Sequence, residues 1–189
     1  PVLIDIMKSS EQNMVVKYKS GEEIRVEATE ENIRKYAKYT KEYDLGILAV
    51  SIPADSDYLD FNTHFIDSPG TNTIIKEHEE ITKYILKKSD IAIYVFNKAI
   101  AQSDIANIRE ILKYTDDIIF IATHMDVERN SEYIYREEVE IDRFINEAKE
   151  QLKNSLNIEY VEIYSIGSRA SYKNEKYIKV IRETVKQYR

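Results

Sequence analysis

Three short runs of polar residues in this chain have the residue types of a ligand site. Asp67 to Gly70, Thr123 to Asp126 and Ser165 to Ser168 each follow an apolar segment and offer carboxylates, hydroxyls and backbone amides. Taken singly, each run is as consistent with an ordinary turn, because Asp, Ser, Pro and Gly are common turn formers. Their order is the stronger signal, since one apolar and one amphipathic segment separate the first run from the second.

Alternating strand and helix patterns surround these runs. Residues 91–96 are continuously apolar, as in a strand buried on both faces. Further strands are predicted at residues 2–6, 14–18, 23–26, 45–52, 58–66, 118–122 and 160–164. Helices are predicted at residues 29–43, 76–86, from 103 onward, at 132–154 and in a last segment through Tyr177 to Tyr188. Strands that alternate with helices predict an α/β domain with a mostly parallel sheet.

This topology would bring the three polar runs together. The carboxyl ends of parallel strands meet at one edge of a sheet, and ligands of open α/β sheets bind beyond that edge. The runs follow the strands predicted at 58–66, 118–122 and 160–164. We therefore expect all three runs on one rim of the domain.

Composition argues against several other kinds of site. The chain has no cysteine and only three histidines, which excludes thiolate chemistry and argues against zinc. With 34 acidic against 27 basic residues and a net charge of -7, we expect no binding to nucleic acid. No apolar run approaches the roughly 18 residues that a membrane span needs. The absence of cysteine also favours a reducing, cytoplasmic compartment.

Four segments carry a resemblance to a known family. They are Phe65-Ile66-Asp67-Ser68-Pro69-Gly70-Thr71-Asn72, Ile81-Thr82-Lys83-Tyr84-Ile85, Ser89-Asp90-Ile91-Ala92-Ile93-Tyr94-Val95-Phe96 and Thr123-His124-Met125-Asp126. Together they resemble the GTPase domain of bacterial dynamin-like proteins and mitofusins, in the dynamin superfamily. The resemblance covers about residues 1–170 and is strongest from 58 to 126. It implies a P-loop-NTPase-like three-layer α/β domain with GTP as substrate and magnesium as cofactor.

The resemblance also implies a role for each polar run. Asp126 would accept two hydrogen bonds from N1 and N2 of guanine, donors that adenine does not present. Asp67 would hold magnesium through a water, and the amide of Gly70 would face the γ-phosphate. The other residues implied at the nucleotide are Thr123, His124, Ser165, Ile166 and Gly167.

Two features depart from the family pattern. The phosphate loop G-x-x-x-x-G-K-S/T is nowhere in the sequence, and His124 stands where the family usually has lysine. We interpret residues 1–189 as a partial GTPase domain, truncated before residue 1, that lacks its first strand and P-loop and has two newly exposed sheet edges. Phosphoryl transfer rests on positioning and charge stabilisation, so the chain by itself is expected to be inactive.

Two functions follow as alternatives. In the first, the intact protein binds and hydrolyses GTP to drive membrane remodelling. It forms a homodimer through the GTPase domain and contacts the membrane only through regions outside this chain. In the second, the chain is a non-catalytic α/β interaction module that kept the fold and lost the site. A phosphate loop encoded shortly before Pro1 would favour the first.

Overall fold

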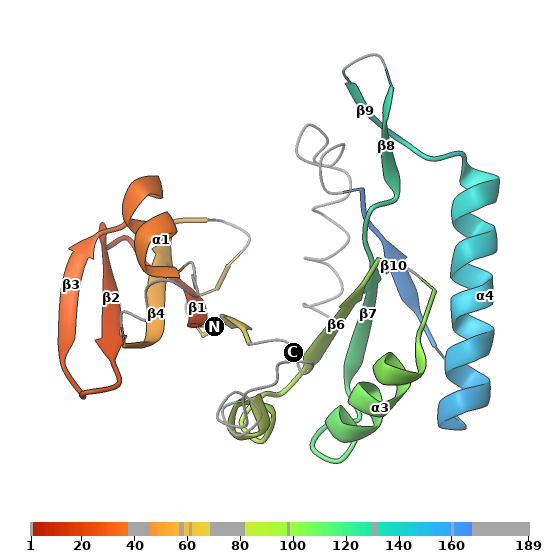
Figure 1. The fold of residues 1–189 in the computed structure, drawn as a ribbon, viewed down its shortest axis with the longest axis horizontal. Coiled ribbons are helices and arrows are strands. Elements are labelled where there is room, and N and C mark those ends of the chain that lie inside the picture. The colour runs from red at the N-terminus through yellow and green to blue at the C-terminus, as the bar shows by residue number, and fades with distance from the viewer. Residues whose placement is uncertain are drawn as a thin grey trace. The chain divides into compact units, whose positions relative to one another are not determined.

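The chain forms two compact units, Pro1–Ile85 and Leu86–Arg189, and each has its own hydrophobic core. The computed structural model describes residues 2–37, 46–56, 59–60, 62–68, 82–97, 99–129, 132–159 and 161–167 (Figure 1). Gly70, most of the predicted helix 76–86 and the whole final segment through Tyr188 lie outside the described residues. Residues 82–86 of that predicted helix are helical.

The first unit contains a five-stranded sheet in the order β3-β2-β4-β1-β5. Its strands are β1 (Leu3–Lys8), β2 (Asn13–Tyr18), β3 (Glu23–Glu27), β4 (Ile47–Ala54) and β5 (His64–Asp67). β1 and β4 are parallel, whereas β1–β5, β2–β3 and β2–β4 are antiparallel. This sheet is therefore mixed rather than mostly parallel, because β2 and β3 are joined directly by a short turn that only antiparallel strands can use.

The β2–β3 turn and α1 (Glu30–Ala37) follow from local sequence. Gly21 has a φ of +89°, which suits glycine in a tight turn, and the Tyr18 amide donates to Glu22 O at 2.8 Å. The Thr29 hydroxyl accepts a hydrogen bond from the Asn32 amide at 3.2 Å and so caps α1. The core beneath consists of Met14, Val16, Ile47 and Val50.

The second unit contains a three-stranded parallel sheet in the order β10-β7-β6. Its strands are β6 (Ala92–Phe96), β7 (Ile118–Ala122) and β10 (Ile163–Ser165), and its helices include α3 (Gln102–Ile111) and α4 (Glu138–Leu156). β7 is the central strand, and its residues Ile119 and Phe120, which face opposite ways, are 6% and 5% exposed. The parallel pairing predicted here is confirmed. The prediction that residues 91–96 are buried on both faces is wrong, because Ile93 and Val95 of β6 are 37% and 56% exposed.

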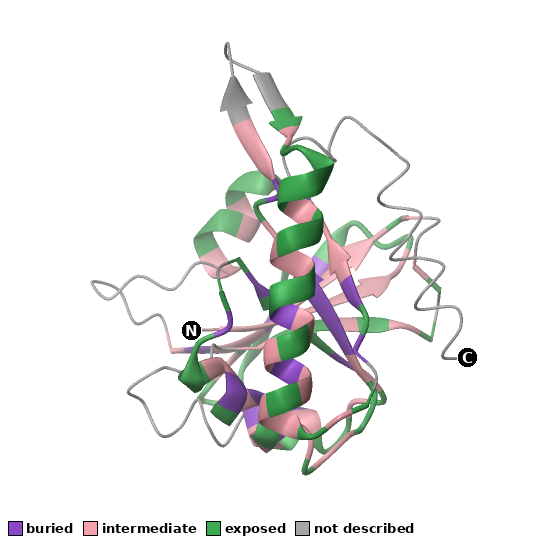
Figure 2. Ribbon diagram, turned by 90° about the vertical axis from the view of Figure 1, so that its right-hand side faces the viewer, coloured by how far each residue is buried: buried purple, intermediate pink, exposed green. Residues whose placement is uncertain are grey.

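Helices α3 and α4 pack with one face of this sheet. Ile108 of α3 and Leu152 of α4 are fully buried in the same core as Phe120. The rings of Phe96 and Phe144 stack with centroids 6.1 Å apart. Figure 2 shows buried, half-buried and exposed residues alternating along α4, as an amphipathic helix requires. This core fixes the carboxyl ends of β6 and β7.

A hairpin replaces the start of the helix predicted at 132–154. β8 (Asp126–Arg129) and β9 (Glu132–Tyr135) pair antiparallel, and α4 begins only at Glu138 (Figure 1). Only two residues separate the paired Arg129 and Glu132, so the strands are adjacent in sequence and pair locally. The apolar residues at helical spacing in the prediction belong to α4, and Tyr133 to Tyr135 do not continue that helix.

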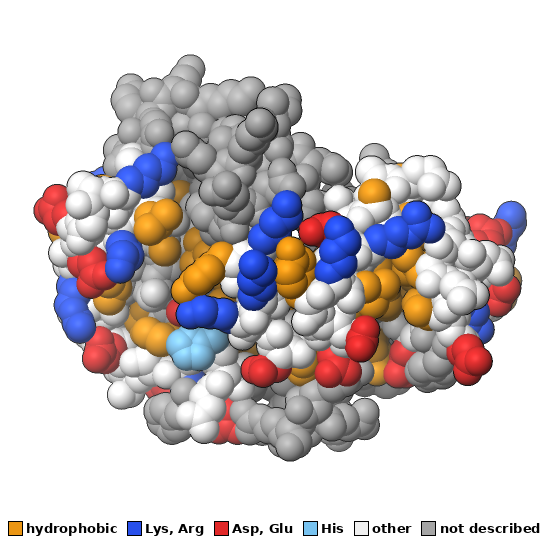
Figure 3. All heavy atoms as spheres, turned by 90° about the horizontal axis from the view of Figure 1, so that it is seen from below, with side chains coloured by type: hydrophobic (Ala, Val, Ile, Leu, Met, Phe, Trp, Pro, Cys, Tyr) orange, Lys and Arg blue, Asp and Glu red, His pale blue; other side chains and the backbone are white. Residues whose placement is uncertain are grey.

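The face of the molecule shown in Figure 3 carries mixed charge. Basic and acidic side chains both occur on the face shown in Figure 3, with apolar side chains between them. Among the residues that the structure describes, no helix is long and apolar enough to cross a membrane.

Candidate functional site

The loops after β7 and β10 are joined by backbone hydrogen bonds. The Ile166 amide donates to Ala122 O at 2.8 Å, and the Met125 amide donates to Ile166 O at 3.3 Å. Because β7 and β10 are parallel neighbours, both loops leave the same edge of the sheet. Residues 123–126 and 166–167 are called the paired loops below. They bring the second and third polar runs into contact.

Gly167 of the second loop packs directly against Asp126 of the first. Gly167 is buried, and a Cβ built on it would lie only 2.9 Å from Asp126 Cβ. Real Cβ atoms are essentially never that close to another heavy atom, so the contact depends on glycine at this position. Asp126 is half-buried at the first position of β8.

Thr123 and His124 form the start of the first loop. The Thr123 amide donates to Phe96 O at 2.8 Å, and its hydroxyl lies 3.3 Å from the same oxygen and 3.1 Å from His124 Nδ1. His124 is exposed with a φ of +62°, an uncommon value for a residue other than glycine. Met125, the next residue, is 4% exposed and anchors the loop in the core. The His124 side chain is therefore exposed, on a loop that the Thr123 hydrogen bonds and the buried Met125 hold in place.

The second loop uses its backbone groups within the protein. The amides of Ile166 and Gly167 donate to Ala122 O and to the Tyr135 hydroxyl, at 2.8 and 3.2 Å. Ile166 O accepts from Met125, and Gly167 O accepts from the Tyr135 hydroxyl at 3.3 Å. A ligand placed against Ile166 and Gly167 would therefore receive no hydrogen bond from these two amides, because each already has an acceptor. Ser165, the last residue of β10, is half-buried.

Asp67 lies in the first unit, at the end of β5. Its Cα pairs with that of Ile4 on β1, and its side chain is exposed. An exposed carboxylate can be reached by a hydrated magnesium ion, which keeps several waters and needs few carboxylates. In the described part of the chain, no group of three His, Cys, Asp or Glu residues could hold a metal. The role of Asp67 at magnesium stays a prediction.

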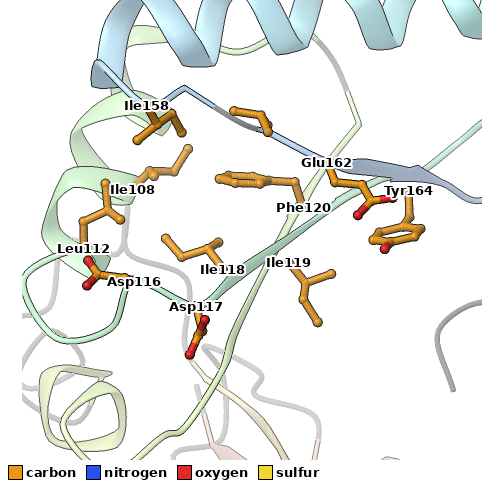
Figure 4. A pocket seen from close by; sticks show the side chains of 11 residues that line it. Ile108, Leu112, Asp116, Asp117, Ile118, Ile119, Phe120, Ile158, Glu162 and Tyr164 are labelled. Carbon is orange, nitrogen blue, oxygen red and sulfur yellow. The ribbon is translucent and has the colours of Figure 1, made fainter. Parts of the chain in front are cut away.

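A hollow in the second unit lies at the other end of β7. It has a volume of about 220 Å³, and Ile108, Ile118 and Phe120 line it (Figure 4). Three carboxylates, Asp116, Asp117 and Glu162, also line it. Ile118 begins β7, whereas the paired loops follow its last residue, so the hollow is separate from them. Its negative charge does not suit phosphate groups.

Two residues at the paired loops were not predicted. Tyr135 contacts Gly167, and the Arg136 amide donates to Met125 O at 2.8 Å. The signal was present in the sequence: Tyr133-Ile134-Tyr135 is β-branched and aromatic, and Asn130-Ser131 before it are turn residues. The helical spacing of the residues that follow concealed it.

Comparison with solved structures defines the class of fold. The chain is similar to a bacterial dynamin in a structure described as an oligomerised pair that provides a mechanism for long-range sensing and tethering of membranes. The TM-score is 0.69 at 13% sequence identity, over 98% of this chain and 32% of that chain, and a second chain with the same description gives the same values. The fold is therefore a mixed α/β fold of the P-loop-NTPase kind.

The family follows from the sequence. The model of the dynamin family matches residues 3–126. The chain belongs to the dynamin family, which confirms the resemblance described above. It is also 26% identical over 110 residues to a probable transmembrane GTPase, FZO-like, chloroplastic, of Arabidopsis thaliana. That match covers 57% of this chain and 11% of the relative, so the chain spans only a small part of the length of that protein.

Proposed function

We propose that the protein containing this chain binds and hydrolyses GTP, and that the paired loops recognise the guanine base. The observation that carries the proposal is the junction of these loops at the carboxyl ends of two parallel strands, with Asp126 against Gly167. Ligands of open α/β sheets bind at this edge. Membership of the dynamin family and the likeness to a probable GTPase support the same activity.

Asp126 is the residue that would select the base. Its two carboxylate oxygens can accept hydrogen bonds from N1 and N2 of guanine, whereas adenine offers no donor pair there. Thr123 would hold the loop by its hydrogen bonds to Phe96 O, and exposed His124 would pack along the base. Ser165, Ile166 and Gly167 would form the wall behind it.

Asp67 and Gly70 are the residues proposed at the phosphate groups of the nucleotide. We propose that Asp67 contacts magnesium through water and that the Gly70 amide faces the γ-phosphate. When bound, magnesium would neutralise charge on the phosphates. Since residues 1–189 contain no G-x-x-x-x-G-K-S/T sequence, we propose that these residues alone do not turn over GTP.

Membrane remodelling and self-association are part of the proposal. The structural neighbours are described as an oligomerised pair that senses and tethers membranes, and the curated relative as a transmembrane GTPase. We propose that this protein is cytoplasmic, dimerises through its GTPase domain and reaches a membrane peripherally, through sequence outside residues 1–189.

The base contact is tested by Asp126→Ala in the longest natural polypeptide that contains this sequence. Losing two charge-assisted hydrogen bonds, together about 3 kcal/mol, should weaken GDP binding by about 100-fold. Asp126→Asn should bind xanthosine diphosphate better than the wild type does, because an amide can donate to the extra carbonyl of xanthine. Titration of fluorescent nucleotides measures both effects.

Asp142→Ala is the matched control, because Asp142 is an exposed aspartate on α4 of the same unit. It should bind GDP as the wild type does. Equal GDP affinity in the Asp126→Ala variant would remove the role proposed for that carboxylate. A wild-type protein that binds no guanine nucleotide would favour the alternative, a non-catalytic interaction module.

Turnover is tested by phosphate release with magnesium and GTP. The long polypeptide should hydrolyse GTP, its Asp67→Ala variant should not, and residues 1–189 alone should release no phosphate above background. Sustained turnover by residues 1–189 would contradict the proposal that the phosphate loop is required.

A further inference from the structure

The hydroxyl of Tyr135 forms hydrogen bonds with both backbone polar groups of Gly167. It accepts a hydrogen bond from the Gly167 amide at 3.2 Å and donates one to Gly167 O at 3.3 Å. Tyr135 is the last residue of β9, and its register partner is Asp126, the first residue of β8. One side chain from the hairpin thus reaches the loop after β10, 32 residues further along the chain.

Packing brings the same residues together. A Cβ on Gly167 would lie 2.9 Å from Tyr135 Cε1 and 3.1 Å from Tyr135 Cζ, as well as 2.9 Å from Asp126 Cβ. Gly167 is therefore enclosed between the tyrosine ring and the aspartate. Because the Tyr135 hydroxyl also fixes both polar groups of Gly167, this residue has little freedom to move relative to Asp126.

Arg136 adds a second connection between the hairpin and the first loop. Its amide donates to Met125 O at 2.8 Å, and its Nε donates to His124 O at 3.3 Å. Met125 in turn donates to Ile166 O. The end of β9 therefore holds the first loop through Arg136 and the second loop through Tyr135.

We propose that Tyr135 is a positioning residue for guanine recognition, and that hairpin β8–β9 is part of the base site. This inference rests on the proposed function. The Tyr135 hydroxyl holds Gly167 against Asp126, and so fixes the position of the second loop relative to the carboxylate that would bind the base. Without the hydroxyl, the second loop can shift away and the base is held less firmly.

The test is Tyr135→Phe in the longest natural polypeptide, since phenylalanine keeps the ring and removes only the hydroxyl. Loss of the two hydrogen bonds should speed the release of fluorescent GDP about tenfold. KM for GTP should rise by a similar factor with kcat unchanged, because the base is bound equally in the ground and transition states. ADP cannot make the proposed hydrogen bonds to Asp126, so its weak binding should be the same in the variant and the wild type.

Tyr94→Phe is the matched control. Tyr94 is a half-buried tyrosine of the same unit, and its hydroxyl donates to Asp104 Oδ1 at 2.7 Å, away from the paired loops. It should lower the unfolding midpoint about as much as Tyr135→Phe while leaving GDP release unchanged. Arg136→Ala, at an exposed position, removes the side-chain donor to His124 O without disturbing the core and should also speed GDP release.

The outcomes separate the two proposals. Wild-type protein without affinity for GDP would defeat the proposed function itself. Wild-type binding with unchanged GDP release in Tyr135→Phe would defeat only the positioning role. The same would follow from a fall in kcat at constant KM, or from equal effects of Tyr94→Phe. If Tyr135→Phe does not fold, unchanged GDP release in Arg136→Ala would count against the inference.

Discussion

Gly167 occupies a crowded position and His124 has an uncommon backbone conformation, and the neighbouring sequence predicts neither. Gly167 is needed because Asp126 and the Tyr135 ring occupy the space of a side chain. His124 holds a left-handed backbone between the Thr123 contacts to β6 and the buried Met125. In both cases tertiary contacts impose the conformation, and the strained or crowded residues cluster at the paired loops.

Gly167→Ala should weaken nucleotide binding and the second unit together. The new methyl group must displace Asp126 or the Tyr135 ring, at a cost of about 1–3 kcal/mol in the free energy of unfolding. Urea unfolding and GDP titration measure the two effects. Gly21→Ala is the control: its φ of +89° also strains alanine, but nothing lies within 4 Å of the added Cβ. Destabilisation without lost GDP affinity in Gly167→Ala would argue against a base-side role.

The surroundings of Tyr94 predict that the free energy of unfolding depends on pH. Burial, and then the hydrogen bond to Asp104, raise the pKa of Tyr94 well above its ordinary value of 10.0. Folding therefore favours the neutral phenol, so this contribution is complete below pH 10 and is lost as pH rises from there towards the folded-state pKa.

The expected result is a gap in stability between wild type and Tyr94→Phe that narrows above pH 10. At pH 8 the variant should lose about 1–2 kcal/mol with the hydrogen bond. Urea unfolding at pH 8, 9.5 and 10.5 measures the gap. A gap that stays constant over this range would show that the Tyr94 pKa is not raised by folding.

At the scale of elements, the hairpin and α4 show where local pattern succeeds and where it fails. The apolar stripe of α4 is visible in the sequence because it repeats at helical spacing. β8 and β9 are four residues each and too short for a clear alternation. Pairing between them, and the hydrogen bonds of Tyr135 and Arg136 to the paired loops, decide their conformation.

The end of α4 offers a test at this scale. Asn157 has a φ of 56° and a ψ of 42°, and its amide donates to Lys153 O at 2.9 Å. Asn157→Gly should be neutral or slightly stabilising, whereas Asn157→Val should cost about 1–2 kcal/mol, because β-branched residues resist this conformation. Asn146→Val, in the exposed middle of α4, is the control and should cost only a few tenths of a kcal/mol. Equal losses for the two valine variants, measured by urea unfolding, would contradict a left-handed cap.

At the scale of the whole molecule, the described residues form a separate core in each of the two units. Val50 is fully buried in the first unit and Leu152 in the second. Because the cores are separate, a cavity made in one unit should destabilise mainly that unit.

Hydrogen exchange tests that independence. Leu152→Ala should cost about 2–5 kcal/mol and speed amide exchange in β6, β7 and β10. Val50→Ala should instead speed exchange in β1, β2 and β4. Uniform loss of protection across both units in either variant would mean that they unfold as one.

Much of the fold could be predicted because buried apolar residues recur at the spacing of a helix or a strand. The strand at 118–122, the parallel pairing around it and the helix after Gln102 are confirmed, and so is membership of the dynamin family. The antiparallel pairing of β1 with β5 and of β2 with β4 could not be predicted from strand patterns, because an apolar strand has the same pattern in either direction. The roles of Asp67, Gly70 and Asp126 stay predictions.

The sequence by itself determined the alternation of apolar and amphipathic segments, and so the α/β class and the three polar runs that begin at or just after strand ends. Tertiary structure alone decided that Asp126, Tyr135 and Gly167 share one small space. The physical reason is that hydrophobic periodicity acts over a few residues. Contact between distant loops depends on sheet order, on hydrogen bonds across β7, β9 and β10, and on whether a Cβ fits.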